Sequence, residues 1–242
     1  MDRTGGGVTA VEAWDLPTDL AVPDPRTARA RFECRGTSPL LVHAMTEDRI
    51  LDIAREAPAL RLPEPPSDLT PAQRRAWERE WCRANLAAPS IHRRDGRSGI
   101  PTRNLLRCLI ETGVYERDRK VRLTDATGSR VPGLIRIEEE FLPFPDEWQE
   151  WELDQREVMR RRRRVIESRA VFPKWGFTAT IAFDPHRFSA ERLRHLIWVA
   201  GYRVGLGSFR TDPRRGHIRA VFGRFKIERW EVLTAGADTK AA

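Results

Sequence analysis

The sequence lacks the segments that mark membrane and secreted proteins. No apolar run approaches the roughly 18 residues that a membrane-spanning helix needs. The first residues, "MDRTGGGVTAVEAWDLP", contain no basic start followed by an apolar run, so we expect no secretory signal. We therefore expect a cytoplasmic protein without a membrane partner. Its 242 residues, 40% of them hydrophobic, are enough to form a packed core.

Cysteine and histidine are scarce, and their spacing predicts no metal site. The three cysteines lie far apart: Cys34, Cys82 and Cys108. An odd number in a chain without a signal indicates free thiols in a reducing compartment. The five histidines show no HxxH or HExxH spacing. They are His43, His92, His186, His195 and His217. We expect no metal or other cofactor, and no nucleophilic role for Cys108 within its apolar helical segment.

Lysine is nearly absent, although the chain is strongly basic. Only four of the 43 lysine and arginine residues are lysines, and the net charge is +8. A GC-rich genome produces such a bias without any functional cause. The functional interpretation is that the planar guanidinium group grips phosphate through two hydrogen bonds and stacks on bases. Composition does not separate these interpretations, whereas clustering of the arginines helps to do so.

Periodicity and capping signals divide the chain into strands and helices. Alternation in "ARARFEC" predicts a strand that breaks at Gly36 and Thr37. Helices are predicted for residues 46–57, 70–86, 100–113 and 189–202, with Thr46, Thr70 and Ser189 as N-caps and Gly113 as a C-cap. Further strands are predicted for "RKVRLTD", "SRVPGLIRIEEEF", "WGFTATIAFD" and "IRAVFGRFKIERWEVL".

The order of these elements predicts an α+β fold. Without the insertions, it approximates a modified RNA-recognition-motif or ferredoxin-like core, a βαββαβ antiparallel sheet, with one additional strand that we do not place. We expect a flexible arm at 1–28, a single domain at 29–232 and a disordered tail at 233–242. Within the domain, helices are inserted at about 46–90, and an arginine-rich, thumb-like insertion at about 143–170. This plan serves many functions and so predicts none by itself.

Glycine and arginine gather near the carboxyl end. Residues 201–226 hold seven basic residues against one acidic residue, Asp212. Gly205 and Gly207 interrupt the chain after a helix, where successive N–H groups can form an anion-binding nest. The segment is neither a Walker loop, since no Gly-Lys-Ser/Thr follows, nor a Rossmann fingerprint, since it follows a helix. It favours contact with nucleic acid over the alternative, a hairpin connection with a solvated basic face.

A second basic cluster lies in mid-chain. Residues 156–169 contain seven arginines against Glu157 and Glu167, and Arg160 to Arg164 are consecutive. Adjacent guanidinium groups repel one another, so they need either full solvation or a polyanion. We favour a basic finger that orders on a phosphate backbone over a plain solvated face.

Catalytic and stacking residues are less well indicated. His217 lies among arginines, where nearby positive charge would lower its pKa, and it is a candidate general acid or base for RNA cleavage. His43 follows an apolar strand and is more typical of a buried or edge histidine. We assign no catalytic residue. Among the tryptophans, Trp175, Trp198 and Trp230 fit core or strand positions, and only Trp148 and Trp151 fit an exposed stacking role.

Three segments together resemble the RAMP superfamily, the repeat-associated proteins of CRISPR systems. "GTSPLLVHAMTEDRI" resembles its opening strand, and "SGIPTRNLLRCLIETG" resembles its Ile-Pro-small-small-leucine helix start. "GYRVGLGSFR…FGRF" resembles its C-terminal glycine-rich loop. The same order of blocks, including "FPKWGFTATIAFD", resembles a group of uncharacterised phage and mobile-element proteins. The resemblance covers residues 30–232, and the order of the motifs makes the case.

The resemblance implies a backbone subunit that polymerises along a guide RNA and grips its phosphates. The implied partners are single-stranded RNA, further copies of the chain and other subunits of an effector complex. The implied RNA-binding residues are Ser98, Thr102, Arg103, Arg107, Arg160, Arg161, Arg162, Arg163, Arg164, Lys174, Arg203, Gly205, Gly207, Arg210, Arg214, Arg215 and His217. The Lys/Arg-Gly-Phe-Gly-Phe signature is absent, so we do not expect bases to stack on strand aromatics. The catalytic aspartate of type III backbone subunits is not placed either, which favours binding without cleavage.

Three alternatives remain open at the level of sequence. The chain would be a phage single-stranded DNA-binding or annealing protein if DNA competes as well as RNA. It would be a metal-independent endoribonuclease if it cleaves RNA in EDTA through His217 or His43. It would be a virion or assembly protein if its basic surface meets an acidic protein instead of a nucleic acid.

Overall fold

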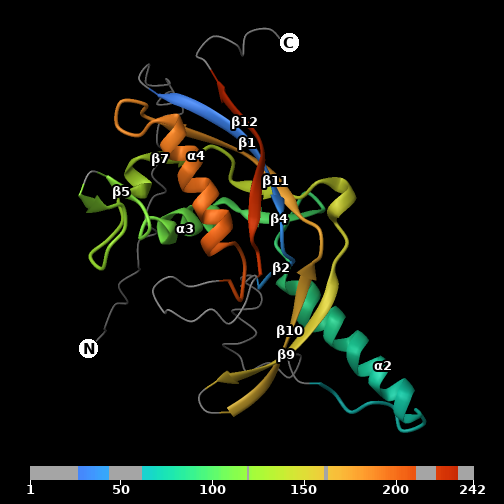
Figure 1. The fold of residues 1–242 in the computed structure, drawn as a ribbon. Helices are drawn as coiled ribbons and strands as arrows, with labels where there is room; N and C mark the ends of the chain where they lie inside the picture. The colour runs from blue at the N-terminus through green and yellow to red at the C-terminus, as the bar shows by residue number, and fades with distance from the viewer. Residues whose placement is uncertain (1–26, 44–61, 119, 161–162, 211–221, 234–242) are drawn as a thin grey trace, which may run out of the picture.

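The computed structural model describes residues 27–43, 62–118, 120–160, 163–210 and 222–233. A four-stranded antiparallel sheet has the order β12-β1-β11-β7 (Figure 1). Its strands are β1 (Ala28–Gly36), β7 (Ile135–Ile137), β11 (Gly176–Phe183) and β12 (Phe225–Leu233). Helix α3 (Thr102–Thr112) lies between β1 and β7 in the chain, and α4 (Ala190–Val199) between β11 and β12. Two split βαβ units thus interlock, which confirms the predicted ferredoxin-like α+β core.

The alternation in β1 explains which face of the sheet is buried. Ala30, Phe32 and Cys34 are buried, whereas Arg31 and Arg35 point to the opposite face and are exposed. The paired positions of β11 continue the apolar face, since Phe32 is opposite Ala179 and Cys34 is opposite Phe177. Apolar side chains of α3 and α4 join the same core: Leu105, Leu109, Leu193, Leu196 and Ile197.

Capping residues define the helix ends as predicted. The Thr70 hydroxyl accepts from the Gln73 N–H, and the Gln73 side chain accepts from the Thr70 N–H, so a capping box opens α2 (Pro71–Cys82). The Ser189 hydroxyl accepts from the N–H of Arg192 at the start of α4. Gly113 follows α3 with right-handed dihedral angles, and a Cβ atom there would overlap the side chain of Thr124.

Two smaller sheets flank the core. One has the order β2-β10-β9 and contains β2 (Leu40–Leu41), β9 (Glu152–Arg160) and β10 (Arg163–Phe172). The other has the order β3-β4-β8, with β3 (Arg93–Arg94), β4 (Arg97–Pro101) and β8 (Phe141–Pro143). Strands β9 and β10 form the long hairpin seen in the lower part of Figure 1, with Arg163 opposite Arg160. The predicted arginine-rich, thumb-like insertion at about 143–170 covers this hairpin except for the last two residues of β10.

Several local predictions are wrong. Val131–Gly133 forms a turn of 3-10 helix instead of strand, and only short pieces pair nearby, β5 (Arg117–Asp118) with β6 (Val121–Arg122). In the described part of the predicted strand over 218–233, β12 begins at Phe225, two residues after Gly223, whose φ is 70°. The predicted helix at 46–57, the arm at 1–26 and the tail at 234–242 lie outside the described residues. Residues 27 and 28, predicted for the arm, and residue 233, predicted for the tail, are described, and Ala28 and Leu233 belong to strands.

One prediction for tryptophan exposure is also wrong. Trp198 is 49% exposed, although its pattern predicts a core or strand position. Trp148 and Trp151, the two that fit an exposed stacking role, are partly exposed, and each carries a guanidinium group over its ring. Trp175 is buried as predicted. In the described part of the chain, no helix combines the length and the apolar character that a membrane crossing requires.

Candidate nucleic-acid interface

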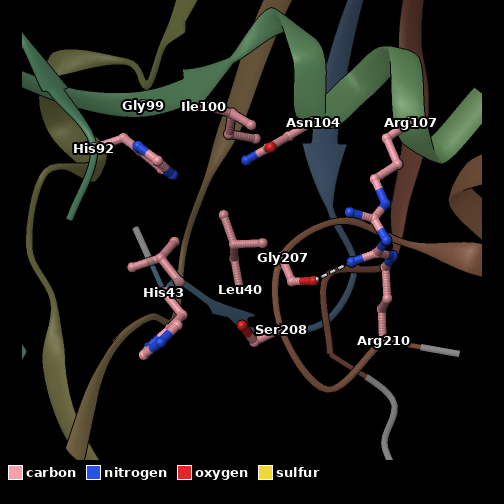
Figure 2. Close-up of a pocket in the computed structure, with 11 residues that line it drawn as sticks. Leu40, His43, His92, Gly99, Ile100, Asn104, Arg107, Gly207, Ser208 and Arg210 are labelled. Atoms are coloured by element: carbon pink, nitrogen blue, oxygen red, sulfur yellow. Dashed lines mark hydrogen bonds between the residues drawn. The ribbon is translucent and has the colours of Figure 1, made fainter. Parts of the chain in front are cut away.

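A polar pocket of about 160 Å³ lies where α3, β4, the segment after β1 and the glycine-rich segment meet (Figure 2). We call residues 205–210 the glycine loop. The described residues that line the pocket come from these four elements and from His92, just before β3 (Arg93–Arg94): Leu40, Val42, His43, His92, Gly99, Ile100, Asn104, Arg107, Gly207, Ser208 and Arg210. The helix start and the glycine loop, which the sequence indicates separately, therefore share one pocket.

Backbone hydrogen bonds hold the glycine loop against two other segments. The Leu206 N–H donates to the Gly223 carbonyl at 2.8 Å, and the Ser208 N–H to the Leu41 carbonyl at 2.7 Å. Gly205 and Gly207 have φ values of 81° and 74°, which glycine adopts at little cost. The N–H of Gly205 also donates internally, to Ala200. The predicted anion nest is therefore wrong for these three N–H groups, because the glycines serve the close approach of backbone to backbone.

A guanidinium–carboxylate clasp joins the glycine loop to α3. Arg210 donates two hydrogen bonds from Nη2 to the two Glu111 carboxylate oxygens, at 2.8 and 3.0 Å, and one from Nη1 to the Gly207 carbonyl at 2.7 Å. The Glu111 side chain is only 13% exposed, and it also accepts from Arg107. Arg210, a predicted RNA-binding residue, thus has its guanidinium group engaged within the protein.

Of the four predicted RNA-binding residues at or near the start of α3, two form internal hydrogen bonds and two are exposed. Ser98 is 4% exposed, and its N–H donates to the Gln149 side chain. Thr102 donates its N–H to the Glu140 carbonyl and its hydroxyl to the Glu139 carbonyl. These two residues anchor the helix start instead of facing solvent. Arg103 and Arg107, one turn apart on α3, differ from them: Arg103 is exposed, and the Arg107 side chain keeps 73% of its surface.

His92 and Asn104 are pocket residues that sequence reasoning missed. Figure 2 shows the His92 ring and the Asn104 side chain extending toward each other across the pocket, whereas the His43 ring points away. Burial lowers the pKa of His92 below its usual 6.5, and the nearby positive charge of Arg103 lowers it further. His92 is therefore neutral at pH 7, and one of its ring nitrogens is an acceptor. No spacing pattern links these two residues, so only the fold identifies them.

The root of the β9–β10 hairpin contacts the glycine loop. Arg169 lies over the Phe209 ring at 4.7 Å, and Arg156 lies 6.0 Å from the same ring. Arg156 also lies over the ring of Phe222, which follows the glycine loop in the chain, at 4.5 Å. Arg169 is nearly buried and pairs with Glu167. A second hollow, beside the pocket, is lined by Arg169, Arg107 and glycine-loop residues. The two basic clusters of the sequence therefore meet at the root of the hairpin.

The remaining predicted residues lie elsewhere or outside the described part. Arg203 lies over the ring of Tyr115 at 5.0 Å and does not line the pocket. Lys174 is exposed in the turn between β10 and β11. Arg160, Arg163 and Arg164 belong to the strands of the hairpin, but their side chains are not described. Arg161, Arg162, Arg214, Arg215 and His217 lie outside the described residues.

The open face of the four-stranded sheet carries ion pairs. Arg29 donates to both Glu138 carboxylate oxygens, at 2.8 and 2.6 Å, and Arg229 pairs with Glu33 at 3.4 Å. Such a surface does not resemble an aromatic stacking platform. Among the described residues, no group of three His, Cys, Asp or Glu side chains is placed to hold a metal ion.

Comparison with known proteins shows only distant structural similarity. No protein-family model matches this chain, and no curated protein matches it. Among solved structures, it is similar to a chain in the cryo-EM structure of the Type III-B Cmr-beta bound to cognate target RNA, with a TM-score of 0.40 and 12% sequence identity. The similarity covers 86% of this chain but 61% of that chain, so this protein spans less than two thirds of its neighbour's length.

Proposed function

We propose that this chain binds single-stranded RNA without sequence preference, as a non-enzymatic backbone subunit repeated along the guide RNA of a CRISPR-type ribonucleoprotein. One observation carries the proposal: α3 and the glycine loop line one polar pocket, and together with Arg169 at the root of the arginine-rich hairpin they line a second hollow beside it. A chain with a net charge of +8 that gathers guanidinium groups at such a junction suits a polyanion.

Charged and neutral groups at the pocket can contact different parts of a bound strand. Arg103 and Arg107 are exposed on α3 beside it, where they can neutralise phosphates of a strand that crosses the helix. Asn104 and neutral His92 lie inside, where they can hydrogen-bond to ribose or phosphate oxygens. Contacts to phosphate and sugar position a strand but carry no sequence information, so we expect little preference among sequences.

Binding without cleavage is the form that the pocket favours. Its described lining contains no aspartate or glutamate, and Glu111 beside it is held by Arg107 and Arg210. A histidine that acts as a base is usually oriented by a third group, often a carboxylate, and among the described lining residues no carboxylate lies next to His92. We therefore assign these residues to binding.

The test is a titration of a short labelled single-stranded RNA at several salt concentrations, followed by fluorescence anisotropy. The variant Arg103→Ala/Arg107→Ala removes the two exposed cations of α3. We expect weaker binding and a salt slope that is shallower by about 0.7 for each phosphate that the variant no longer neutralises. The matched control is Arg187→Ala, in the turn before α4 and far along the chain from the pocket, which should leave both quantities unchanged.

Other outcomes assign a different function. Equal binding of single-stranded DNA of the same sequence would favour a DNA-binding protein. Cleavage of RNA in EDTA that His43→Ala or His217→Ala abolishes would make the chain an endoribonuclease. If the wild-type protein binds neither strand even at low salt, the proposal is wrong, and the basic surface serves an acidic protein partner.

A further inference from the structure

Three aromatic rings stack on one another on the solvent-facing side of α4 and of the helical turn that follows it. The His195 and Trp198 rings have centroids 5.7 Å apart and an interplanar angle of 21°. The Trp198 and Tyr202 rings are 5.4 Å apart at 10°. Trp198 is 49% exposed and Tyr202 58%. We call His195, Trp198 and Tyr202 the aromatic ladder.

The ladder is not needed to fill the core. Leu193, Leu196 and Ile197 already supply the buried side of α4, and the ladder occupies the opposite side at positions i, i+3 and i+7. Tyr202 lies in a π-helical turn, Ala200–Val204, a wide turn that is rare and often occurs at functional sites. Large exposed side chains that gather in one stripe, rather than being scattered, indicate a binding surface.

Cations without a carboxylate partner in the described part of the chain flank the ladder. Arg224 lies 5.9 Å from the Tyr202 ring, and its Nε atom has no hydrogen-bond partner among the residues that the structure describes. Arg203, next to Tyr202, lies over the ring of Tyr115 at 5.0 Å. No described carboxylate forms an ion pair with either guanidinium group.

A carboxylate holds the His195 end of the ladder in place. Glu116 lies 3.2 Å from His195 Nε2, which orients the first ring of the stack. The other end leads directly into the glycine loop, since Gly205 ends the π-helical turn that contains Tyr202. The ladder is therefore continuous along the chain with the candidate nucleic-acid interface.

We propose that the aromatic ladder is a base-stacking site, on which bases of a single strand stack while Arg203 and Arg224 contact the adjacent phosphates. The proposal rests on the proposed function and adds to it how bases, and not only phosphates, are held. Every base has a flat π-face, so a stacking site of this kind binds without sequence preference. Exposed parallel rings flanked by guanidinium groups are the combination that single-strand binding surfaces use.

The test compares a base-bearing RNA with an abasic strand that has the same number of phosphates. Trp198→Ala should weaken binding of the base-bearing strand about tenfold and leave binding of the abasic strand within about twofold. Trp198→Phe keeps a ring and should restore most of the affinity. Arg103→Ala/Arg107→Ala should weaken both strands alike, because it removes phosphate contacts only.

A second measurement keeps the test independent of folding defects. Bases that stack on Trp198 should quench its fluorescence, so base-bearing RNA should quench the wild-type protein more than Trp198→Phe. The ladder proposal is overturned if Trp198→Ala binds base-bearing RNA as tightly as the wild type, or if it weakens both strands equally. It is also overturned if Trp198→Ala changes the sedimentation of the RNA-free protein, since the ladder would then be a protein interface. If the wild-type protein binds no strand, the proposed function fails as well.

Discussion

At the scale of single residues, Gly223 shows how tightly the loop segments pack. A Cβ atom there would overlap the Leu206 carbonyl, and the φ of 70° disfavours any side chain. We expect Gly223→Ala to lower the free energy of unfolding by about 2–4 kcal/mol, measured by urea denaturation.

Gly133 provides the matched control for this substitution. It lies in the 3-10 turn, where a Cβ atom would meet nothing within 4 Å and φ is not positive. Gly133→Ala should therefore change stability by no more than about 0.5 kcal/mol. Equal effects of the two substitutions would mean that Gly223 is not packed between backbone segments.

The buried thiols allow a prediction about pH and reactivity. Burial raises the pKa of the Cys108 thiol to about 12, with a contribution from Glu111 that Arg210 opposes. Burial also raises the pKa of Cys34, and the charges of Cys108 and Glu228 add to this. Because the raised pKa keeps these thiols protonated, the reactive thiolate of Cys108 at pH 8 is about one part in ten thousand.

Alkylation with iodoacetamide at pH 8, counted by mass spectrometry, tests this expectation. The folded protein should be labelled at Cys82, which is partly exposed, and not at Cys34 or Cys108. All three should react in guanidinium chloride, which serves as the control. Rapid labelling of Cys108 in the folded protein would show that the α3 side of the loop opens to solvent.

Single residue types indicate local structure well and tertiary partners poorly. The Thr70 and Ser189 caps could be predicted because each acts on a backbone N–H three residues away. Arg210 could not, because its partner Glu111 is 99 residues distant and only the fold brings them together. The core prediction for Trp198 is wrong because the helix pattern does not show that leucine and isoleucine already fill the buried face.

At the scale of elements, the sequence indicated the core more clearly than the site. Alternation in β1 and periodicity in α3 and α4 fix which face is apolar, and this determines the sheet and its helices. The pocket instead joins β4, α3, the segment after β1, the glycine loop and the residue before β3. His92 and Asn104 belong to the site through this packing, which no local pattern encodes.

Shortening the β9–β10 hairpin should weaken RNA binding and leave the fold intact. Its root is tied to the glycine loop through Arg156, Arg169 and the ring of Phe209, whereas Arg160 and Arg163 pair at its far end. Replacing residues 157–166 by Asn-Gly keeps the pair Arg156 and Glu167 as the last strand residues and removes five arginines. We expect the melting temperature to stay within a few degrees and RNA affinity to fall.

The salt slope of binding is the discriminating measurement for this shortened hairpin. It should decrease by about 0.7 for each phosphate that the removed arginines neutralised. A variant of full length with serine at positions 160–164 is the control, and it should show the same decrease. An unchanged slope in both variants would mean that the arginine run faces solvent and does not contact RNA, which is the alternative interpretation of the cluster as a solvated face.

At the scale of the whole molecule, the two faces of the core have different characters. Helices α3 and α4 cover one face of the four-stranded sheet, and ion pairs such as Arg29–Glu138 occupy the open face. Three features lie on elements outside that open face: the exposed arginines of α3, the β9–β10 hairpin, and the aromatic ladder. A strand bound by these elements would follow the helical side and the edge, and would leave the open face available to other contacts.

A subunit that binds phosphates in this way should load along a strand in regular steps. We expect the number of bound copies, measured by native mass spectrometry, to double each time the length of the RNA doubles, since each copy covers a fixed length of backbone. The Arg103→Ala/Arg107→Ala variant should need more protein for each step without changing the step length. A copy number that stays constant as the RNA lengthens would mean that the chain binds one structured feature or an end, and repetition along a guide would then be wrong.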